Sequence, residues 1–200
     1  MTPFVSFQIP TYRRMDRLPA CLESILGKAN NPQDVEILLR VTDTDRETMD
    51  AIPLLLKMGN VKALVGPRKN GYSSLTEYHD EIAQISTGEW LWQWNDDVMM
   101  LVQGWDGLLS NLSSESIYLP DTHRLGGSTY HRDARCPFLL MHASHWNPMM
   151  GERNFGAMGA LSDLVAFSYA EKNNMPTKFI AGLAVHHLRD TEEQIAETRK

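Results

Sequence analysis

The most informative part of this 200-residue sequence is WLWQWNDDVMM, which runs from Trp90 to Met100. Its three tryptophans alternate with other residues, a pattern typical of a strand that packs one face into a core. The run then reaches Asn95, Asp96 and Asp97. Neighbouring carboxylates repel each other and lose solvation beside a packed strand, so they indicate either a solvated turn or a site where a cation binds.

Three shorter apolar runs precede the tryptophan strand, and apolar residues at helical spacing follow each of them. Near-continuous apolar runs of this kind are typical of buried parallel strands. The alternation of short strands with helices predicts an α/β fold with a doubly wound, parallel sheet. Besides the tryptophan run, the expected strands cover residues 5–9, 35–41 and 61–65.

The predicted helices begin at residues that favour helix starts. Asp16 can cap the first helix. The segments TDRE at 44–47 and SLTE at 74–77 match the capping box and predict the starts of the second and third helices. Pro53 is expected to kink or divide the second helix.

The second half of the chain has a less regular pattern. Strands are predicted at 116–119, 137–142 and 179–188, and a helix is predicted at 160–172. The polar segment 120–136 is predicted to be a loop. This half therefore adds to the sheet without the strict alternation of strand and helix that marks the first hundred residues.

Composition excludes several classes of protein. The net charge of −6 gives no basic footprint for nucleic acid. No apolar stretch approaches the ~20 residues of a membrane helix, and the first residues lack a signal-peptide pattern. The two cysteines, Cys21 and Cys136, cannot build a disulfide framework, which is typical of a reducing compartment. We therefore expect a cytoplasmic protein whose residues 1–200 form a single domain.

Polar residues follow all four predicted parallel strands, at 10–13, 42–45, 68–71 and 95–97. Ligands of open parallel sheets bind at these carboxyl ends. Carboxylate oxygens there favour Mg²⁺ or Mn²⁺ over zinc, and such ions usually accompany phosphates. Arg68 and Lys69 could help to neutralise a diphosphate, and Asp43 or Asp45 could accept a hydrogen bond from a base or a ribose hydroxyl.

Three segments together resemble nucleotide-sugar glycosyltransferases of the GT-A fold: VSFQIPTYRR at 5–14, VEILLRVTDTD at 35–45 and GEWLWQWNDD at 88–97. The pattern is most similar to the large inverting family that includes cellulose synthases and bacterial surface-polysaccharide transferases. The resemblance implies a Rossmann-like fold, with a mostly parallel central sheet flanked by helices. It further implies a nucleotide-binding half at 1–100 and a less regular, acceptor-binding half at 101–200.

The resemblance also implies a site for a nucleoside-diphosphate sugar, with a UDP-type donor favoured. In it, the turn after the first strand contacts the nucleoside, an aspartate after the second strand binds the base, and the loop after the third strand lies near the base and ribose. The matching positions are Pro10, Thr11, Tyr12 and Arg13 in the first of these, Asp43 or alternatively Asp45 in the second, and Arg68 and Gly71 in the third.

The same resemblance implies the metal ligands and the base of a transferase. Asp97 matches the last carboxylate of the DxD motif, which binds Mn²⁺ or Mg²⁺, and Asp96 lies beside it. His187 matches a late histidine that joins the metal or the diphosphate. Asp163 matches the carboxylate that takes the proton of the acceptor hydroxyl, and such a base opposite the leaving group implies inversion. If Asp163 is too far from the acceptor, a retaining reaction stays open. The sequence departs from the motif at Asn95, whose amide oxygen can still bind a metal or a ribose hydroxyl but brings no charge.

Other functions remain open at this point. A protein of the same fold that binds nucleotide or glycan without turnover is compatible with Asn95. A sugar-phosphate nucleotidyltransferase is less favoured, because it would need a glycine-rich phosphate loop where the chain has PTYRR at 10–14. A dinucleotide-binding dehydrogenase would need GxGxxG after the first strand, and that motif is absent.

Several candidate residues also have purely structural explanations. Asp163 lies near a helix start, where an acidic side chain favours the helix dipole. His142 and His145 have the wrong spacing for the HExxH motif, so we expect them to be structural. Trp105 and Trp146 could stack on an acceptor sugar, although packing in the core is the more common role for tryptophan.

Overall fold

Four parallel strands form the first part of the sheet in the computed structural model of the chain. They lie side by side in the order β3-β2-β1-β4, with bounds β1 (Val5–Thr11), β2 (Val35–Thr42), β3 (Val61–Gly66) and β4 (Trp90–Gln93). The structure describes residues 3–70, 74–125, 127–133, 136–152 and 162–188. These strands confirm the predicted α/β fold with a parallel central sheet flanked by helices.

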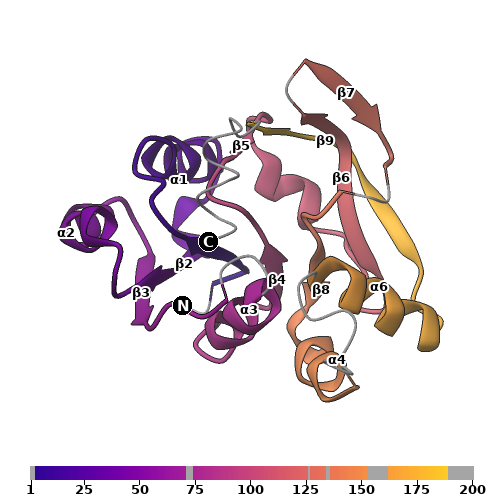
Figure 1. Cartoon of the computed structure of the whole chain (residues 1–200). Coiled ribbons are helices and arrows are strands. Elements are labelled where there is room, and N and C mark those ends of the chain that lie inside the picture. Colours follow the sequence, from indigo (N-terminus) through magenta and orange to yellow (C-terminus); the bar gives the residue numbers. More distant parts are fainter. Residues whose placement is uncertain (1–2, 71–73, 126, 134–135, 153–161, 189–200) are drawn as a thin grey trace.

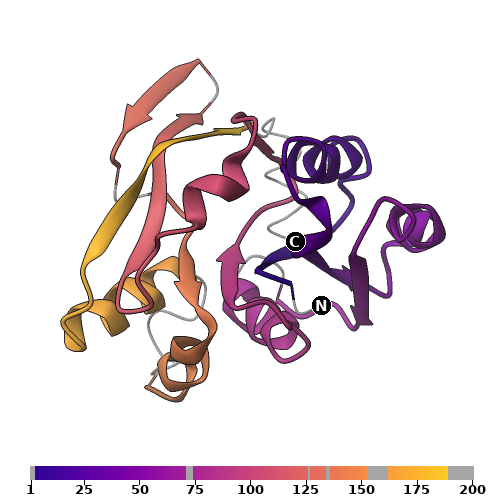
Figure 2. The same cartoon turned by 180° about the vertical axis from the view of Figure 1, so that it is seen from behind.

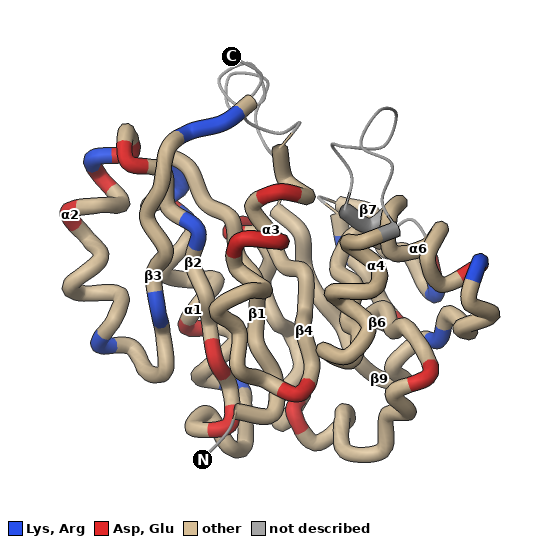
Figure 3. The backbone as a smooth tube through the Cα atoms, turned by 90° about the horizontal axis from the view of Figure 1, so that it is seen from below, with Lys and Arg blue, Asp and Glu red and all other residues tan. Residues whose placement is uncertain are grey.

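Among the described residues, each connection between these strands contains one α-helix. The helix α1 (Leu18–Leu26) joins β1 to β2, α2 (Arg46–Leu55) joins β2 to β3, and α3 (Leu75–Ala83) joins β3 to β4. A short 3-10 turn, η1 (Pro32–Asp34), leads into β2. The last crossover runs back along the sheet, so a right-handed connection places α3 on the opposite face from α1 (Figures 1 and 3).

The later strands extend the same sheet beyond β4. They are β5 (Val98–Met100), β6 (Ile117–Leu125), β7 (Ser128–His131), β8 (Leu140–His142) and β9 (Thr177–His187). The order continues β4-β8-β6-β9-β5, and β7 forms a hairpin with β6. The strand β8 is antiparallel to both neighbours, whereas β6 and β9 are parallel and run side by side (Figure 2). At the far edge, β5 pairs antiparallel with β9.

The described residues of the later part contain these helical segments: η3 (Trp105–Leu109), η4 (Ala143–His145), α4 (Trp146–Glu152) and α6 (Ser162–Lys172). The helices α4 and α6 pack against each other beside β8 (Figure 1). Within the part of the chain that the structure describes, every helix is too short or too polar to cross a lipid bilayer.

The tryptophans build the core where the two parts of the sheet meet. The ring of Phe7 on β1 lies 4.9 Å from Trp92, 5.2 Å from Trp94 and 5.2 Å from Trp105, measured between centroids. All four side chains are fully buried, and Trp146 is 2% exposed. Trp105 and Trp146 therefore pack in the interior, and the idea that they line an acceptor pocket is not supported.

The face of the sheet beneath α3 is unusually polar. Glu36 on β2 is fully buried, and its carboxylate accepts hydrogen bonds from the Ser6 hydroxyl and the Lys62 ammonium. It also accepts from the backbone N–H and the hydroxyl of Thr87, both at 2.9 Å. Burial alone would raise the pKa of Glu36, but these hydrogen bonds hold it below its usual value.

Two helix starts differ from the sequence prediction. The first helix begins at Leu18 and its cap position is Arg17, so Asp16 does not cap it. The second helix is capped by Asp45 rather than Thr44, because the Asp45 carboxylate accepts a hydrogen bond from the backbone of Thr48 at 3.3 Å.

The prolines and the polar segment 120–136 also behave differently from the prediction. Pro53 lies inside α2, which continues past it without a break, and β1 continues through Pro10. Residues 120–125 belong to β6 and residues 128–131 form β7, where a loop was expected. They form strands because they pair with each other and with β9, which are contacts that local polarity does not reveal.

Candidate functional site

The carboxyl ends of β1 and β3 meet through one aromatic ring. The guanidinium of Arg68, in the loop after β3, lies 4.0 Å from the centre of the Tyr12 ring, and that of Arg13 lies 5.2 Å from it. Cations at these distances are attracted to the ring face. Beside them, Pro10 is half-buried, and Thr11 is buried with a hydroxyl that has no partner among the described residues.

The two aspartates after β2 occupy different environments. Asp45 is 2% exposed, and its second carboxylate oxygen accepts from the backbone N–H of Arg13 at 2.6 Å, so it ties the end of β1 to the start of α2. Asp43 is exposed, and only its backbone N–H is held, by Gly66 at 3.0 Å. Of the two, Asp43 is therefore the residue that is exposed at the surface.

Arg40 supports the loop that carries Arg68. It is 2% exposed, and its guanidinium donates to the carbonyl oxygens of Gly66 at 3.1 Å and Pro67 at 3.0 Å. A side chain at Gly66 would bring its Cβ to 2.8 Å from Arg40 Nη2, so glycine makes room for this contact. An ion pair with Glu81 on α3 neutralises the buried charge.

Asp97 lies where the parallel strands meet the later part of the sheet. It is 6% exposed, and its Oδ2 atom lies 3.3 Å from Nε2 of His187 and 3.8 Å from Nη1 of Arg17. Its Oδ1 atom is buried and has no hydrogen-bond partner among the described residues. Because Val98 pairs with His187 in the β5–β9 ladder, residues that are far apart in sequence become neighbours here.

The other two residues of the acidic run sit beside Asp97. Asp96 is 8% exposed. Asn95 is half-buried, and its backbone oxygen accepts hydrogen bonds from the Val98 N–H at 3.3 Å and the Cys21 thiol at 3.5 Å. Burial raises the pKa of that thiol, so Cys21 remains protonated.

A second histidine lies against His187. The ring of His123 on β6 is 5.7 Å from that of His187, with an angle of 23° between the planes, and Phe138 packs edge-on against both. His123 is 7% exposed. Burial lowers its pKa below the usual value for histidine, and the neighbouring His187 lowers it further. Sequence reasoning missed His123, because a lone histidine in a polar segment gives no signal before β6 and β9 are known to pair.

The side chains of two predicted site residues fall outside the described part of the structure. Gly71 is not described. Asp163 lies in the first turn of α6, but its side chain is not described. The predicted base is therefore known only by its place in the backbone.

Asp97 and His187 suit a divalent cation that is shared with a substrate. Among the described residues, no three His, Cys, Asp or Glu side chains gather closely enough to hold a metal by themselves. A hard cation bound with a diphosphate needs fewer, because one or two protein ligands suffice when phosphate and water oxygens supply the rest. The unpaired Oδ1 of Asp97 and the imidazole of His187 provide that donor set.

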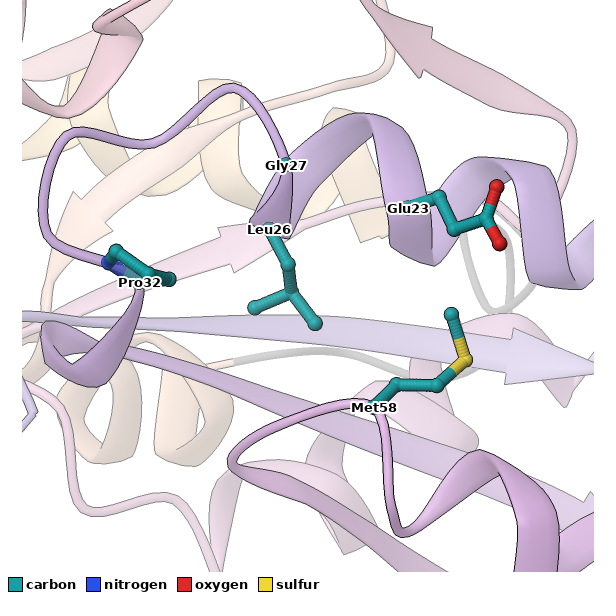
Figure 4. Close-up of a pocket in the computed structure, with 5 residues that line it drawn as sticks. All are labelled: Glu23, Leu26, Gly27, Pro32 and Met58. Atoms are coloured by element: carbon teal, nitrogen blue, oxygen red, sulfur yellow. The ribbon is translucent and has the colours of Figure 1, made fainter.

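A separate hollow of about 340 Å³ lies at the opposite edge of the sheet. It is lined by Glu23, Leu26, Gly27, Pro32 and Met58 (Figure 4). These residues belong to the end of α1 and to the segments that lead into β2 and β3. The hollow thus lies near the amino ends of these strands, away from the carboxyl ends that carry the candidate site, and it takes no part in that site.

His142 and His145 each contact a neighbouring hydroxyl group. The Nδ1 atom of His142 lies 2.7 Å from the Ser144 hydroxyl, at the start of η4. The Nδ1 atom of His145 lies 3.3 Å from the Tyr169 hydroxyl on α6. These contacts fix the connection between β8 and α4.

Comparison with known proteins identifies the fold. No protein-family model matches this sequence, and no curated protein sequence is significantly similar to it. Solved structures of S. aureus TarS, a glycosyltransferase with the GT-A fold, do match. All three TarS structures below are 12% identical to this chain in sequence.

The match extends over nearly the whole of this chain. TarS 1-349 in complex with UDP has a TM-score of 0.68 and covers 98% of this chain and 63% of its own. The complex with UDP-GlcNAc has a TM-score of 0.69, and the match covers 96% of this chain and 60% of that TarS chain. A longer TarS chain has a TM-score of 0.72, and the match covers 98% of this chain and 38% of that one. The chain thus spans less than two thirds of the TarS chains that it matches. The GT-A fold that the sequence motifs imply is thereby confirmed.

Proposed function

We propose that this protein transfers a sugar from a nucleoside-diphosphate sugar, with UDP as the favoured nucleotide, to a hydroxyl group of a carbohydrate or other acceptor. The observation that carries the proposal is the meeting of Asp97 with His187 and Arg17 at the carboxyl edge of a GT-A sheet. In open α/β sheets generally, ligands bind at this edge, outside the carboxyl ends of the strands. Structures of TarS, which shares the fold, contain UDP or UDP-GlcNAc.

The nucleotide half, residues 1–100, would bind the donor through the strand ends. The exposed carboxylate of Asp43 accepts an N–H of the base, and the cluster of Tyr12 with Arg13 and Arg68 flanks the nucleoside. The amide of Asn95 is suited to a ribose hydroxyl. Pro10, Thr11 and Gly71 complete the turns around it, and Asp45 acts indirectly, by holding the backbone of Arg13.

The diphosphate would lie near Asp97 and His187. These two side chains, with Asp96 beside them, would hold Mn²⁺ or Mg²⁺, which stabilises the charge that develops on a leaving diphosphate. Arg17 and His187 both contact Oδ2 of Asp97, so the carboxylate is already oriented and its Oδ1 would be the atom that meets the metal. A carboxylate held in one orientation loses less entropy when a ligand binds.

The acceptor half, residues 101–200, would supply the base. Asp163 is proposed to take the proton of the acceptor hydroxyl as that oxygen attacks the anomeric carbon, while the bond to the diphosphate breaks on the opposite face. The product is inverted at the anomeric carbon. Proton and charge balance, because the base gains the one proton that the hydroxyl loses and the diphosphate leaves with the bonding electron pair.

The proposal is tested by calorimetric titration of UDP, GDP, ADP and dTDP with and without Mn²⁺. We expect UDP to bind most tightly and Mn²⁺ to tighten it. Asp97→Asn should remove the effect of Mn²⁺, whereas Asp50→Asn, an exposed aspartate on α2, should leave it unchanged. If Mn²⁺ does not affect the binding of any nucleotide, or if the Asp97 variant still shows its effect, the proposed site is wrong.

Turnover separates the enzyme from a binding protein of the same fold. Release of UDP from a panel of UDP-sugars should be measurable with the wild-type chain and lost in Asp163→Asn, while the affinity of that variant for UDP stays unchanged. The lack of charge at Asn95 is the feature that favours a binding protein without activity. Tight binding of UDP with Mn²⁺ but no turnover of any sugar nucleotide would establish that second function instead.

A further inference from the structure

Three rings form a compact group behind the Asp97 carboxylate. The centroids of His123 and His187 are 5.7 Å apart with nearly parallel planes, and Phe138 meets the two rings edge-on at 5.4 Å and 5.2 Å. The register explains the arrangement. His123 pairs with Val185 and Leu125 pairs with His187, so His123 and His187 project from the same face of adjacent strands.

His187 needs such support because of where it lies. It is the last residue of β9, and its only ladder partner on one side is the three-residue strand β5. A histidine that binds a metal usually has its ring held by a hydrogen bond from the second ring nitrogen. Among the described residues, the ring of His187 makes an ion-pair contact with Asp97 and ring contacts with His123 and Phe138, and no further side-chain hydrogen bond holds it. Its orientation toward Asp97 therefore depends on packing.

We propose that His123 is a positioning residue of the donor site, which holds the His187 ring by stacking so that Nε2 points at Asp97. The inference rests on the proposed role of His187 at the diphosphate. The contribution of His123 comes from its ring faces rather than from a hydrogen bond, because its Nε2 atom is buried and has no partner among the described residues. A phenylalanine ring of similar shape should therefore be able to replace it.

The test measures the ratio of UDP affinities with and without Mn²⁺ by calorimetry. His187→Ala removes the proposed metal ligand itself, so its loss in this ratio is the upper limit for any variant that acts through His187. Loss of a group that orients a metal ligand typically weakens metal binding by 10-fold or more, so His123→Ala should reduce the ratio on the order of 10-fold. His123→Phe should restore it, and His123→Ala should cause no further loss when combined with His187→Ala.

A matched control removes a ring elsewhere in the same strand pair. Phe179 on β9 pairs with Leu119 on β6, at the far end of the ladder from His123. Phe179→Ala should destabilise β6 and β9 but leave the ratio unchanged, because it does not touch the His187 ring. If it lowers the ratio as much as His123→Ala does, the effect is one of general stability and the inference fails.

The remaining outcomes separate this inference from the proposed function. If wild-type UDP binding does not respond to Mn²⁺, the proposed function itself is wrong. If the wild type responds and His187→Ala abolishes the response, but His123→Ala retains it in full, only the positioning role is overturned. Failure of His123→Phe to restore the ratio would show that a ring nitrogen, not stacking, is what the site uses, and would also overturn it.

Discussion

The four parallel strands and the strands that follow them bury their polar groups in different ways. Beneath α3, the parallel part buries charges in hydrogen-bonded groups, with Glu36 and Arg40 at their centres. The later part buries imidazole rings against aromatic ones, as His123 and His187 do with Phe138. Hydrogen bonds to a buried charge fix the distances between the groups that they join, whereas stacking fixes the orientation of the ring planes.

The difference suits what each part contributes to the site. In the parallel part, Arg40 and Asp45 hold backbone loops, so the strand ends are tied to one another at defined spacings. In the later part, stacking orients a single ring toward Asp97. The site therefore depends on the junction, by which we mean the place where the parallel strands meet the later strands. There Trp94 packs against Phe7 and Phe138.

The largest effect is expected from breaking that junction with Trp94→Ala. Trp94 is fully buried, and its indole N–H donates to the Val98 carbonyl at 3.2 Å. Removal of a buried tryptophan leaves a cavity and costs about 3–5 kcal/mol of the free energy of unfolding. Denaturation followed by far-ultraviolet circular dichroism and by tryptophan fluorescence should give the same midpoint, lowered from that of the wild type.

Trp94→Phe is the control, because it keeps a ring at the junction and should lose less than half as much stability. Two separate transitions in the variant would show that the two parts of the sheet unfold independently and that the junction does not couple them. A loss below about 1 kcal/mol would show that the junction is not a main element of the core.

A smaller loss is expected from the buried network of the parallel part. Glu36→Gln keeps the shape of the side chain but removes the negative charge of the carboxylate, to which the Lys62 ammonium and the Thr87 N–H donate hydrogen bonds. Hydrogen bonds to charged groups contribute about 1.5–3 kcal/mol each, and the amide retains some of them, so we expect a net loss of about 2 kcal/mol. Urea denaturation at pH 7 measures it.

Glu171→Gln provides the comparison from the later part, since Glu171 is exposed on α6. Its effect should stay within about 0.5 kcal/mol of the wild type. If the two substitutions cost the same, buried charge does not distinguish the parallel part from the rest of the molecule.

The same contrast explains how far the sequence predicts the fold. The succession of β1 to β4 along the chain, with a helix between each strand and the next, follows from apolar periodicity, because strand and helix have different local patterns. Their order within the sheet does not follow from such patterns. The β6–β7 hairpin was predicted as a loop because its strands are largely polar and exposed at that end. The pairing of β6 with β9 is a long-range property that no local pattern carries.

The site shows a similar limit. The residues at the four parallel strand ends could be named from the sequence, because a parallel sheet brings carboxyl ends to one edge. The meeting of Asp97 with His187 came from a family resemblance rather than from periodicity. The capping role of Asp45 and the contact of His123 with His187 could not be predicted, since both depend on tertiary distances.

The smallest effect concerns pH and a histidine beneath the parallel part. His79 on α3 is 3% exposed, and burial lowers its pKa from 6.5 to about 3. The unfolded chain therefore binds a proton near pH 6.5 that the folded chain does not bind, so stability falls as the pH drops below 6.5 toward 3. Between pH 7.5 and 5.5 the loss should be on the order of 1 kcal/mol, a window above the lowered pKa values of Glu36 and Glu81.

His79→Leu should remove this part of the pH dependence, because leucine has no proton to bind in the unfolded chain. His131→Leu, which replaces an exposed histidine on β7, should keep the wild-type slope. Urea midpoints at pH 7.5, 6.5 and 5.5 for the three proteins give the slopes directly. An unchanged slope in His79→Leu would mean that a hydrogen-bond partner or water stabilises the charged ring in the folded state. Burial of His79 would then not lower its pKa in the folded chain, contrary to this prediction.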